Sequence, residues 1–141
     1  MRAGLRVAAA VVTLLAAGAA GAAAQLKDPT IGSRALTNAD LQKHVAITNE
    51  VALARKGIKE ISSPAGIQQV RAVTVAACAR QGWGSLDYGV VNARVTAALL
   101  HIFMEATVPV PADKKAEVEL VRKWKPRIEA AKRGQGSPPP A

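Results

Sequence analysis

Hydrophobic positions recur with a helical period in four segments of the chain, and glycines or prolines stand between the segments. The four segments cover about residues 37–56, 64–81, 86–106 and 112–133. No segment alternates between apolar and polar residues as a half-buried strand does. The pattern therefore predicts an all-α domain, a small four-helix bundle-like arrangement.

Capping residues define the start of the first two segments. Thr37 is followed three residues later by Asp40, a short-armed version of the capping box, and Gly57 is placed to end the helix. Ser63 precedes Pro64, which suits the first helical position because the N–H that proline lacks would have no helical partner there. These signals predict two separate helices joined by a short connector.

Two glycines enclose Trp83 at the centre of the chain. Gly82 is placed to end the second helix, and Ser85 is placed to cap the third. Since the flanking segments are both apolar and helix-periodic, the stretch predicts the turn of a helical hairpin. We expect Trp83 to pack back on the end of the bundle, as hydrophobic residues after a glycine stop commonly do.

Each segment predicts its own buried face. The third segment is apolar almost all round, which is typical of a helix in the middle of a bundle, so we expect it to be the most buried element. The side opposite its buried face also carries apolar residues that would need a neighbouring element to bury them: Val90, Ala97, Leu100 and Phe103. The expected core residues are Leu41, His44, Val45, Thr48, Val51, Ala52 and Arg55, then Ile67, Val70, Val73, Thr74, Ala77 and Cys78, then Tyr88, Val91, Val95, Ala98, Leu99 and Ile102, and finally Ala116, Leu120, Trp124, Ile128 and Ala131.

Pro126 interrupts the last segment. A proline inside a helix removes a hydrogen bond and costs about 3 kcal/mol. The last helix is therefore predicted to be kinked or broken near Pro126, around residues 122–125.

The first 24 residues predict export. Arg2 and Arg6 precede an apolar run from Val7 to Ala17, and small residues follow as far as Ala24. This is the pattern of a secretory signal peptide cleaved after Ala24, and it predicts a periplasmic or secreted protein. The alternative is a transmembrane anchor, but the strongly apolar part is shorter than the roughly 18 residues that span a bilayer. The mature chain then comprises an extended lead-in (25–36), the helical domain (37–133) and a disordered tail (134–141).

The chain is strongly basic. It has 19 Lys and Arg against 10 Asp and Glu, and removal of Arg2 and Arg6 leaves a net charge of about +7 because the first 24 residues contain no acid. Such a surplus favours an acidic protein or an anionic envelope or membrane surface as partner. Export and the lack of aromatic residues among the basic ones argue against nucleic acid. No further segment predicts a transmembrane helix in the mature chain, and the oligomeric state stays open.

No catalytic constellation is recognisable, so the sequence does not predict an enzyme. Cys78 is the single cysteine and most resembles a small buried core residue. His101 is excluded as its partner because hairpin geometry separates the two by roughly 18 Å. His44 lies level with Cys78, and a contact between them is possible, although a third group to orient the histidine is not evident.

Cofactor and metal signals are equally weak. His101 and Met104 share a helix face and could offer two ligands to copper or haem, but no further ligands accompany them. The acids are few, which argues against a glycosidase, and Gly82-x-Gly84 lacks the rest of a phosphate-binding loop. We therefore predict no cofactor and no metal.

The last helix carries the most suggestive surface, in which basic residues surround a narrow apolar stripe. The alternative is an ordinary solvated face, with Glu119–Lys123 and Glu129–Arg133 as helical ion pairs. The candidate binding residues are Lys115, Arg122, Lys123, Trp124, Lys125 and Arg127. The sequence thus predicts a non-enzymatic interaction module, or alternatively a ligand, metal or redox accessory protein that uses the interior around Cys78, His44 or His101/Met104.

Overall fold

The structure, a computed structural model, describes residues 26–136. The predicted signal peptide and residues 137–141 of the predicted tail lie outside them. The helices are α2 (Asn38–Lys56), α3 (Pro64–Arg80), α4 (Ser85–Met104) and α5 (Lys115–Lys132), with a short 3₁₀ helix, η1 (Ala112–Lys114), before α5. The described part of the chain has no strand, and the all-α prediction is confirmed.

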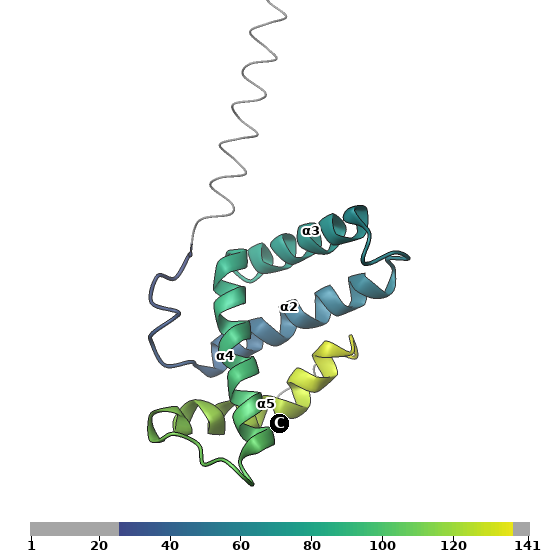
Figure 1. Cartoon of the computed structure of the whole chain (residues 1–141). Coiled ribbons are helices and arrows are strands. Elements are labelled where there is room, and N and C mark those ends of the chain that lie inside the picture. Colours follow the sequence, from purple (N-terminus) through teal and green to yellow (C-terminus); the bar gives the residue numbers. More distant parts are fainter. Residues whose placement is uncertain (1–25, 137–141) are drawn as a thin grey trace, which may run out of the picture.

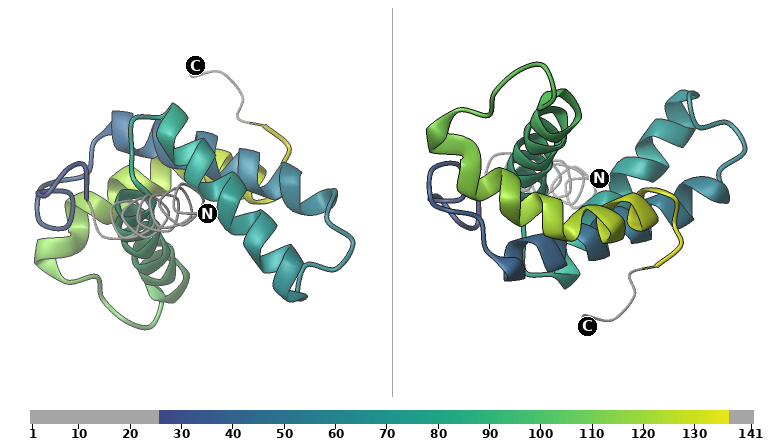
Figure 2. Two further views of the ribbon diagram at one scale, coloured as in Figure 1. Left: turned by 90° about the horizontal axis from the view of Figure 1, so that it is seen from above. Right: turned by 90° about the horizontal axis from the view of Figure 1, so that it is seen from below.

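The helix α2 lies between α3 on one side and α5 on the other, and α4 crosses them (Figure 1). The most extensive packing joins α2 to α5, α2 to α3, and α4 to α5. The two further views show α5 running beneath both α2 and α4 (Figure 2). The core therefore sits where α2, α4 and α5 meet.

The predicted caps of the first two helices are confirmed. The N–H of Thr37 donates to Asp40 Oδ2 at 2.8 Å, and Thr37 Oγ1 accepts from the Asp40 N–H at 3.3 Å, which completes the capping box. Ser63 Oγ accepts from the N–H of Gly66, with Pro64 as the first helical residue. The third cap differs from the prediction, because α4 begins at Ser85 itself and Gly84 is its N-cap.

The turn between α3 and α4 has the predicted form. Gly82 takes a positive φ of 75°, and the N–H of Trp83 donates to the carbonyl of Cys78 at 2.9 Å. This bond and the one from the Gly82 N–H to the Ala79 carbonyl form a Schellman motif, which needs the left-handed conformation that glycine supplies. Trp83 is only 4% exposed, so the prediction that it packs back on the bundle is confirmed.

The expectation that α4 is the most buried helix is corrected. Val91, Val95 and Ala98 are buried, but Leu100 and Phe103 on the same helix are exposed. The C-terminal part of α4 extends away from α2 and α3 toward the loop that leads to η1 (Figure 1). No described element covers the outer face there, so its apolar residues stay in solvent.

The other stripes also need correction. In α3 only Gly66, Ala77 and Cys78 are buried and Ile67 is exposed, because α3 packs chiefly on α2 and has no second layer over it. In α5 the predicted burial of Trp124, Ile128 and Ala131 is confirmed. Ala116, however, is exposed, and Leu120 is only half-buried. Val118 and Val121 take those places in the core. In α2 Ile47 is buried, although it lies outside the predicted stripe, and Arg55 is exposed.

The last helix passes through Pro126 without a break and is one element from Lys115 to Lys132. Buried residues on both sides of the proline hold it to the core, with Val121 and Trp124 before it and Ile128 after it. Of the two predicted outcomes, the break is therefore not observed, and the bend stays a prediction.

The segment before α2 folds more fully than the predicted extended lead-in. Residues 28–33 form turns, and Ile31 is completely buried. The carboxylate of Asp87, itself fully buried, accepts hydrogen bonds from the backbone N–H groups of Lys27 (2.9 Å), Asp28 (2.8 Å) and Gly84 (3.0 Å). One acid thus ties the lead-in to the start of α4.

Two arginines complete the attachment of the lead-in. Arg94 donates from α4 to the carbonyls of Ile31 and Arg34, each at 2.8 Å. Arg34 in turn forms ion pairs with Asp28 and Asp40. Hydrogen bonds from Arg34 hold the pKa of the Asp40 carboxyl below its usual value.

Within residues 26–136, none of these helices has the length and apolar character that crossing a membrane requires.

Replacing Asp87 by alanine should lower the free energy of unfolding by about 3 kcal/mol, because the partly buried N–H groups of Lys27, Asp28 and Gly84 lose a charged acceptor. Urea denaturation measures this change. Asp113→Ala, at an exposed acid in η1, is the matched control and should change stability by less than about 0.5 kcal/mol. Faster amide exchange at Lys27 and Asp28 should accompany the loss in Asp87→Ala. An unchanged stability of that variant would contradict the role given to this carboxylate.

Candidate functional site

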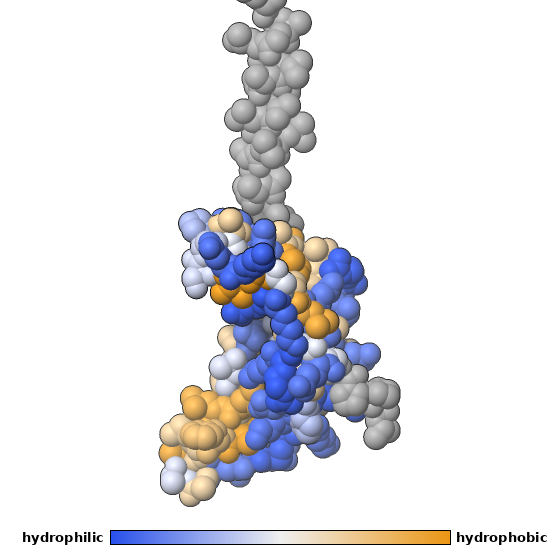
Figure 3. Space-filling view, turned by 90° about the vertical axis from the view of Figure 1, so that its right-hand side faces the viewer, coloured by the Kyte–Doolittle hydropathy of each residue, from blue (hydrophilic) through white to orange (hydrophobic). Residues whose placement is uncertain are grey.

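An exposed apolar surface lies at the end of α4. It consists of Leu100, Phe103 and Met104, which share one helix face, and of Val108, whose N–H bonds to the Met104 carbonyl at 2.8 Å. Phe103 is 85% exposed and Leu100 56%. We call these four residues the apolar end; Figure 3 shows a hydrophobic area at the corresponding lower end of the molecule. A phenylalanine so exposed has no role in the core, and such a patch commonly marks an interaction surface.

Basic residues border the apolar end. Arg122 donates two hydrogen bonds to Glu105, the residue after α4, at 2.8 and 2.5 Å. The charges of Arg122 and Lys125 both act on the Glu105 carboxyl, and its pKa is held low chiefly by the Arg122 hydrogen bonds. On another side Lys114 lines a pocket together with His101. Cations from η1 and α5 therefore lie near the C-terminal end of α4, the part of the helix that carries the apolar end.

The predicted basic face of α5 divides into surface and core residues. Lys115, Lys123 and Lys125 are exposed, as expected for a contact surface. Trp124 is 9% exposed, and its indole N–H donates to Asn38 Oδ1 at 2.8 Å, which fixes α5 to the start of α2. Trp124 therefore belongs to the core and not to a binding surface. The guanidinium of Arg127 lies over its ring, 4.6 Å from the centroid.

Arginines, and no lysine, form the ion pairs of the described residues. Arg80 pairs with Glu50, Arg94 with Glu117, and Arg122 with Glu105 and Glu119. The Arg122–Glu119 pair stands where the sequence predicts Glu119–Lys123. Because the arginines occupy these acids, the exposed lysines keep their charge available for an external partner.

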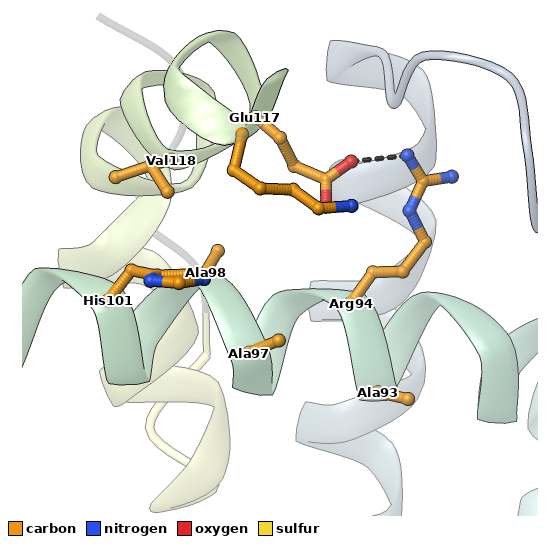
Figure 4. A pocket seen from close by; sticks show the side chains of 8 residues that line it. Ala93, Arg94, Ala97, Ala98, His101, Glu117 and Val118 are labelled. Atoms are coloured by element: carbon orange, nitrogen blue, oxygen red, sulfur yellow. Dashed lines mark hydrogen bonds and ion pairs between the residues drawn. The ribbon is translucent and has the colours of Figure 1, made fainter. Parts of the chain in front are cut away.

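The pocket beside Lys114 has a volume of about 220 Å³ and lies between α4 and the start of α5. Arg94 and Glu117 close one end of it with their ion pair, and His101 lies at the other end (Figure 4). Alanines 93, 97 and 98 form its floor. Two of its polar side chains, Arg94 and Glu117, are engaged with each other.

The structure brings no metal set together around the predicted His101–Met104 pair. His101 faces Lys114 and Val118 across the pocket, and Met104 is part of the exposed apolar end. Within residues 26–136 no group of three or more His, Cys, Asp or Glu side chains could hold a metal ion.

His44 and Cys78 are both fully buried. His44 Nε2 lies 3.0 Å from Asn92 Oδ1, an acceptor, so Nε2 carries the proton and Nδ1 is left without a partner in the described structure. The ring stacks on Tyr88, with centroids 5.5 Å apart. Burial and the charge of Lys132 lower the pKa of His44, while burial and the charge of Asp87 raise the pKa of Cys78 to about 11. A neutral histidine tied to an amide and a protonated thiol are not an activated pair.

A second hollow, of about 450 Å³, lies where the C-terminal ends of α2 and α5 meet. We call it the C-terminal groove. Arg55 and Lys56 from α2 and Lys132 and Arg133 from α5 line it, together with Thr48 and Tyr88. The sequence analysis missed this cluster because its two basic pairs lie about 77 positions apart and each alone is an ordinary basic helix end.

Comparison with known proteins finds no matching protein-family model, no similar curated protein and no similar solved structure.

The thiol of Cys78 should resist alkylation in the native protein. A pKa raised from 9.0 to about 11 lowers the thiolate fraction at pH 8 about a hundredfold, and burial slows attack further. The reaction with an aromatic disulfide reagent, followed with and without denaturant, measures the difference. Rapid modification of native protein would contradict the inert reading and revive a chemical role for Cys78.

Acidification should destabilise the protein through His44. Its folded pKa lies below the ordinary 6.5, so below that pH the unfolded chain binds a proton that the folded chain does not. Stability present above pH 6.5 is then lost as the pH falls toward the folded pKa, with a slope of at most about 1.4 kcal/mol per pH unit. Urea midpoints between pH 7 and pH 5 measure the slope. His44→Leu should flatten it and His101→Gln should not; a flat profile of the unaltered protein would oppose the assignment.

Proposed function

We propose that this chain is an exported, non-enzymatic helical interaction module that binds an anionic envelope component, specifically a membrane surface rich in anionic lipid. The observation that carries the proposal is Phe103, 85% exposed at the end of α4 among other apolar residues and beside basic ones. Export rests on the pattern of residues 1–24, with cleavage after Ala24, and would place the module in the periplasm or outside the cell.

An apolar tip with a basic border matches the two layers of a membrane surface. Insertion of Phe103 and Leu100 between lipid headgroups removes apolar area from water, and a phenylalanine side chain contributes about 1.5–3 kcal/mol when fully buried. Lys114 and Lys125 then come close to headgroup phosphates, where a basic residue contributes about 1 kcal/mol. An acidic protein would satisfy the lysines, but it would also need an apolar pocket for Phe103. A lipid surface supplies both layers without such a pocket, so lipid is the partner that we propose.

Two further points belong to the same proposal. Pro126 leaves the carbonyl of Arg122 without its helical donor, and a bend of α5 there would alter how the basic face follows a flat surface. The alternative role as a ligand, metal or redox accessory has weaker support, because Cys78 is held protonated, His44 is bound to Asn92, and His101 faces a lysine.

Vesicle co-sedimentation tests the membrane proposal. Binding to vesicles that contain one quarter phosphatidylglycerol should exceed binding to pure phosphatidylcholine and should fall with added salt. Phe103→Ser should weaken binding about tenfold or more, from the lost burial. Ile67→Ser removes a residue that is also exposed (48%), but on α3, and is the matched control; it should leave binding unchanged.

Charge variants complete the test. Lys114→Gln and Lys125→Gln should each reduce binding to anionic vesicles about fivefold, at about 1 kcal/mol per charge. Salt-sensitive binding to poly-glutamate that is insensitive to Phe103→Ser, with no vesicle binding, would assign the surface to an acidic protein. Binding to neither probe at low salt would overturn the proposal.

A further inference from the structure

The C-terminal groove concentrates positive charge that the protein itself does not use. Arg55, Lys56, Lys132 and Arg133 line it, and among the described residues none of them takes part in an ion pair. The residues that line the groove include no acid. All four cations are exposed and come from two helices, so they approach a common space from two sides.

The ends of the helices do not account for this charge. Each helix C-terminus carries about half a negative charge, so α2 and α5 together bring about one. Four cations exceed this by about three positive charges. Two basic residues at the end of a single helix are ordinary, but the meeting of two such ends leaves an electrostatic surplus that only an external anion can neutralise.

A turn of the backbone brings the two ends together. After α5 the N–H groups of Gly134 and Gln135 donate to the carbonyls of Ala131 and Ala130, a Schellman motif with Gly134 at a φ of 66°. A Cβ placed on Gly134 would lie 3.2 Å from Lys56 Nζ, so the α2 ammonium stands directly against this turn. The next contact, from the Gly136 N–H to Asn49 Oδ1 at 2.8 Å, secures the chain to α2. The groove is thus built by specific backbone contacts.

The polar wall of the groove has a hydrogen to donate. Thr48 Oγ1 and Tyr88 Oη lie 2.8 Å apart, and this pair uses only one of their two O–H groups. The second O–H has no partner among the described residues and is free to donate to a ligand oxygen. Burial raises the pKa of Tyr88, which keeps the phenol protonated as a donor.

We propose that the C-terminal groove binds a phosphoryl group. A phosphate monoester or diphosphate supplies up to several negative charges and at least three acceptor oxygens, which suits four cations and a hydroxyl donor approaching from different sides. A carboxylate supplies one charge and two oxygens and would leave most of these groups unused. The phosphoryl group can come from a free phosphorylated compound or from a lipid headgroup.

This site is independent of the apolar end. Tyr88 and Phe103 stand fifteen positions apart on α4, which is about 22 Å along the helix axis. A membrane that receives Phe103 therefore does not have to reach the groove, and either site can exist without the other.

Titration calorimetry of the purified protein with inorganic pyrophosphate at low salt tests the groove. Saturable binding is expected, and Lys132→Gln/Arg133→Gln should weaken it at least about tenfold. Lys123→Gln/Lys125→Gln removes the same charge from α5 outside the groove and should change affinity less than about twofold. Thr48→Val/Tyr88→Phe keeps the ring that stacks on His44 but removes both hydroxyls, and should weaken binding about fivefold.

Two arms distinguish the sources of the phosphoryl group. Vesicles with phosphatidic acid, tested in the Phe103→Ser background, report headgroup binding without the apolar end. Binding of pyrophosphate or of these vesicles that depends on Lys132 and Arg133 supports the site. Absence of saturable binding to both probes, or an equal loss of pyrophosphate affinity in both double variants, would overturn it, because net charge alone would then explain the attraction.

Discussion

The fold depends on one buried carboxylate. Asp87 accepts three backbone hydrogen bonds, two from the segment before α2 and one from the N-cap of α4. An ionised group can be buried only where its oxygens accept hydrogen bonds. The lead-in supplies two of the three donors, so the burial of Asp87 requires the lead-in to lie where it does. Ile31 enters the core on that segment, and α4 thereby gains cover that the other helices do not supply.

The ion pairs of the acids also determine which basic residues face solvent. Asp28 and Asp40 form ion pairs with Arg34, and Glu117 forms one with Arg94. These contacts hold the lead-in and the start of α5 in place. Acids used in this way cannot neutralise exposed lysines. The ion pairs of the described residues thus engage Arg34, Arg80, Arg94 and Arg122. Most lysines, and the basic residues at the ends of α2 and α5, face solvent instead.

Local signals in the sequence predict the local structure well. The Thr37 capping box, the Ser63 cap, the Gly82 stop and the burial of Trp83 all follow from short-range geometry, which a few residues determine. The apolar pattern of α4 predicts a helix correctly but not its environment, since periodicity cannot say whether a neighbour exists to cover Phe103. Ser85 fails as a cap for a related reason: Asp87, bound to the Gly84 N–H, already sets the start of α4.

Contacts between distant segments explain what the sequence could not predict of the candidate sites. The lysines of α5 are recognisable as exposed and Trp124 as a core residue, but the hydrogen bond from Trp124 to Asn38, a residue 86 positions away, is not recognisable. The groove likewise combines the ends of α2 and α5, which meet at the turn of Gly134 beside Lys56. Both candidate sites arise at ends of helices, where helix packing stops and side chains lack internal partners. Because several helices of this domain have no neighbour on their outer face, unpaired charge and exposed apolar area lie at these ends. A partner that binds there buries apolar area and forms ion pairs that the protein alone does not form.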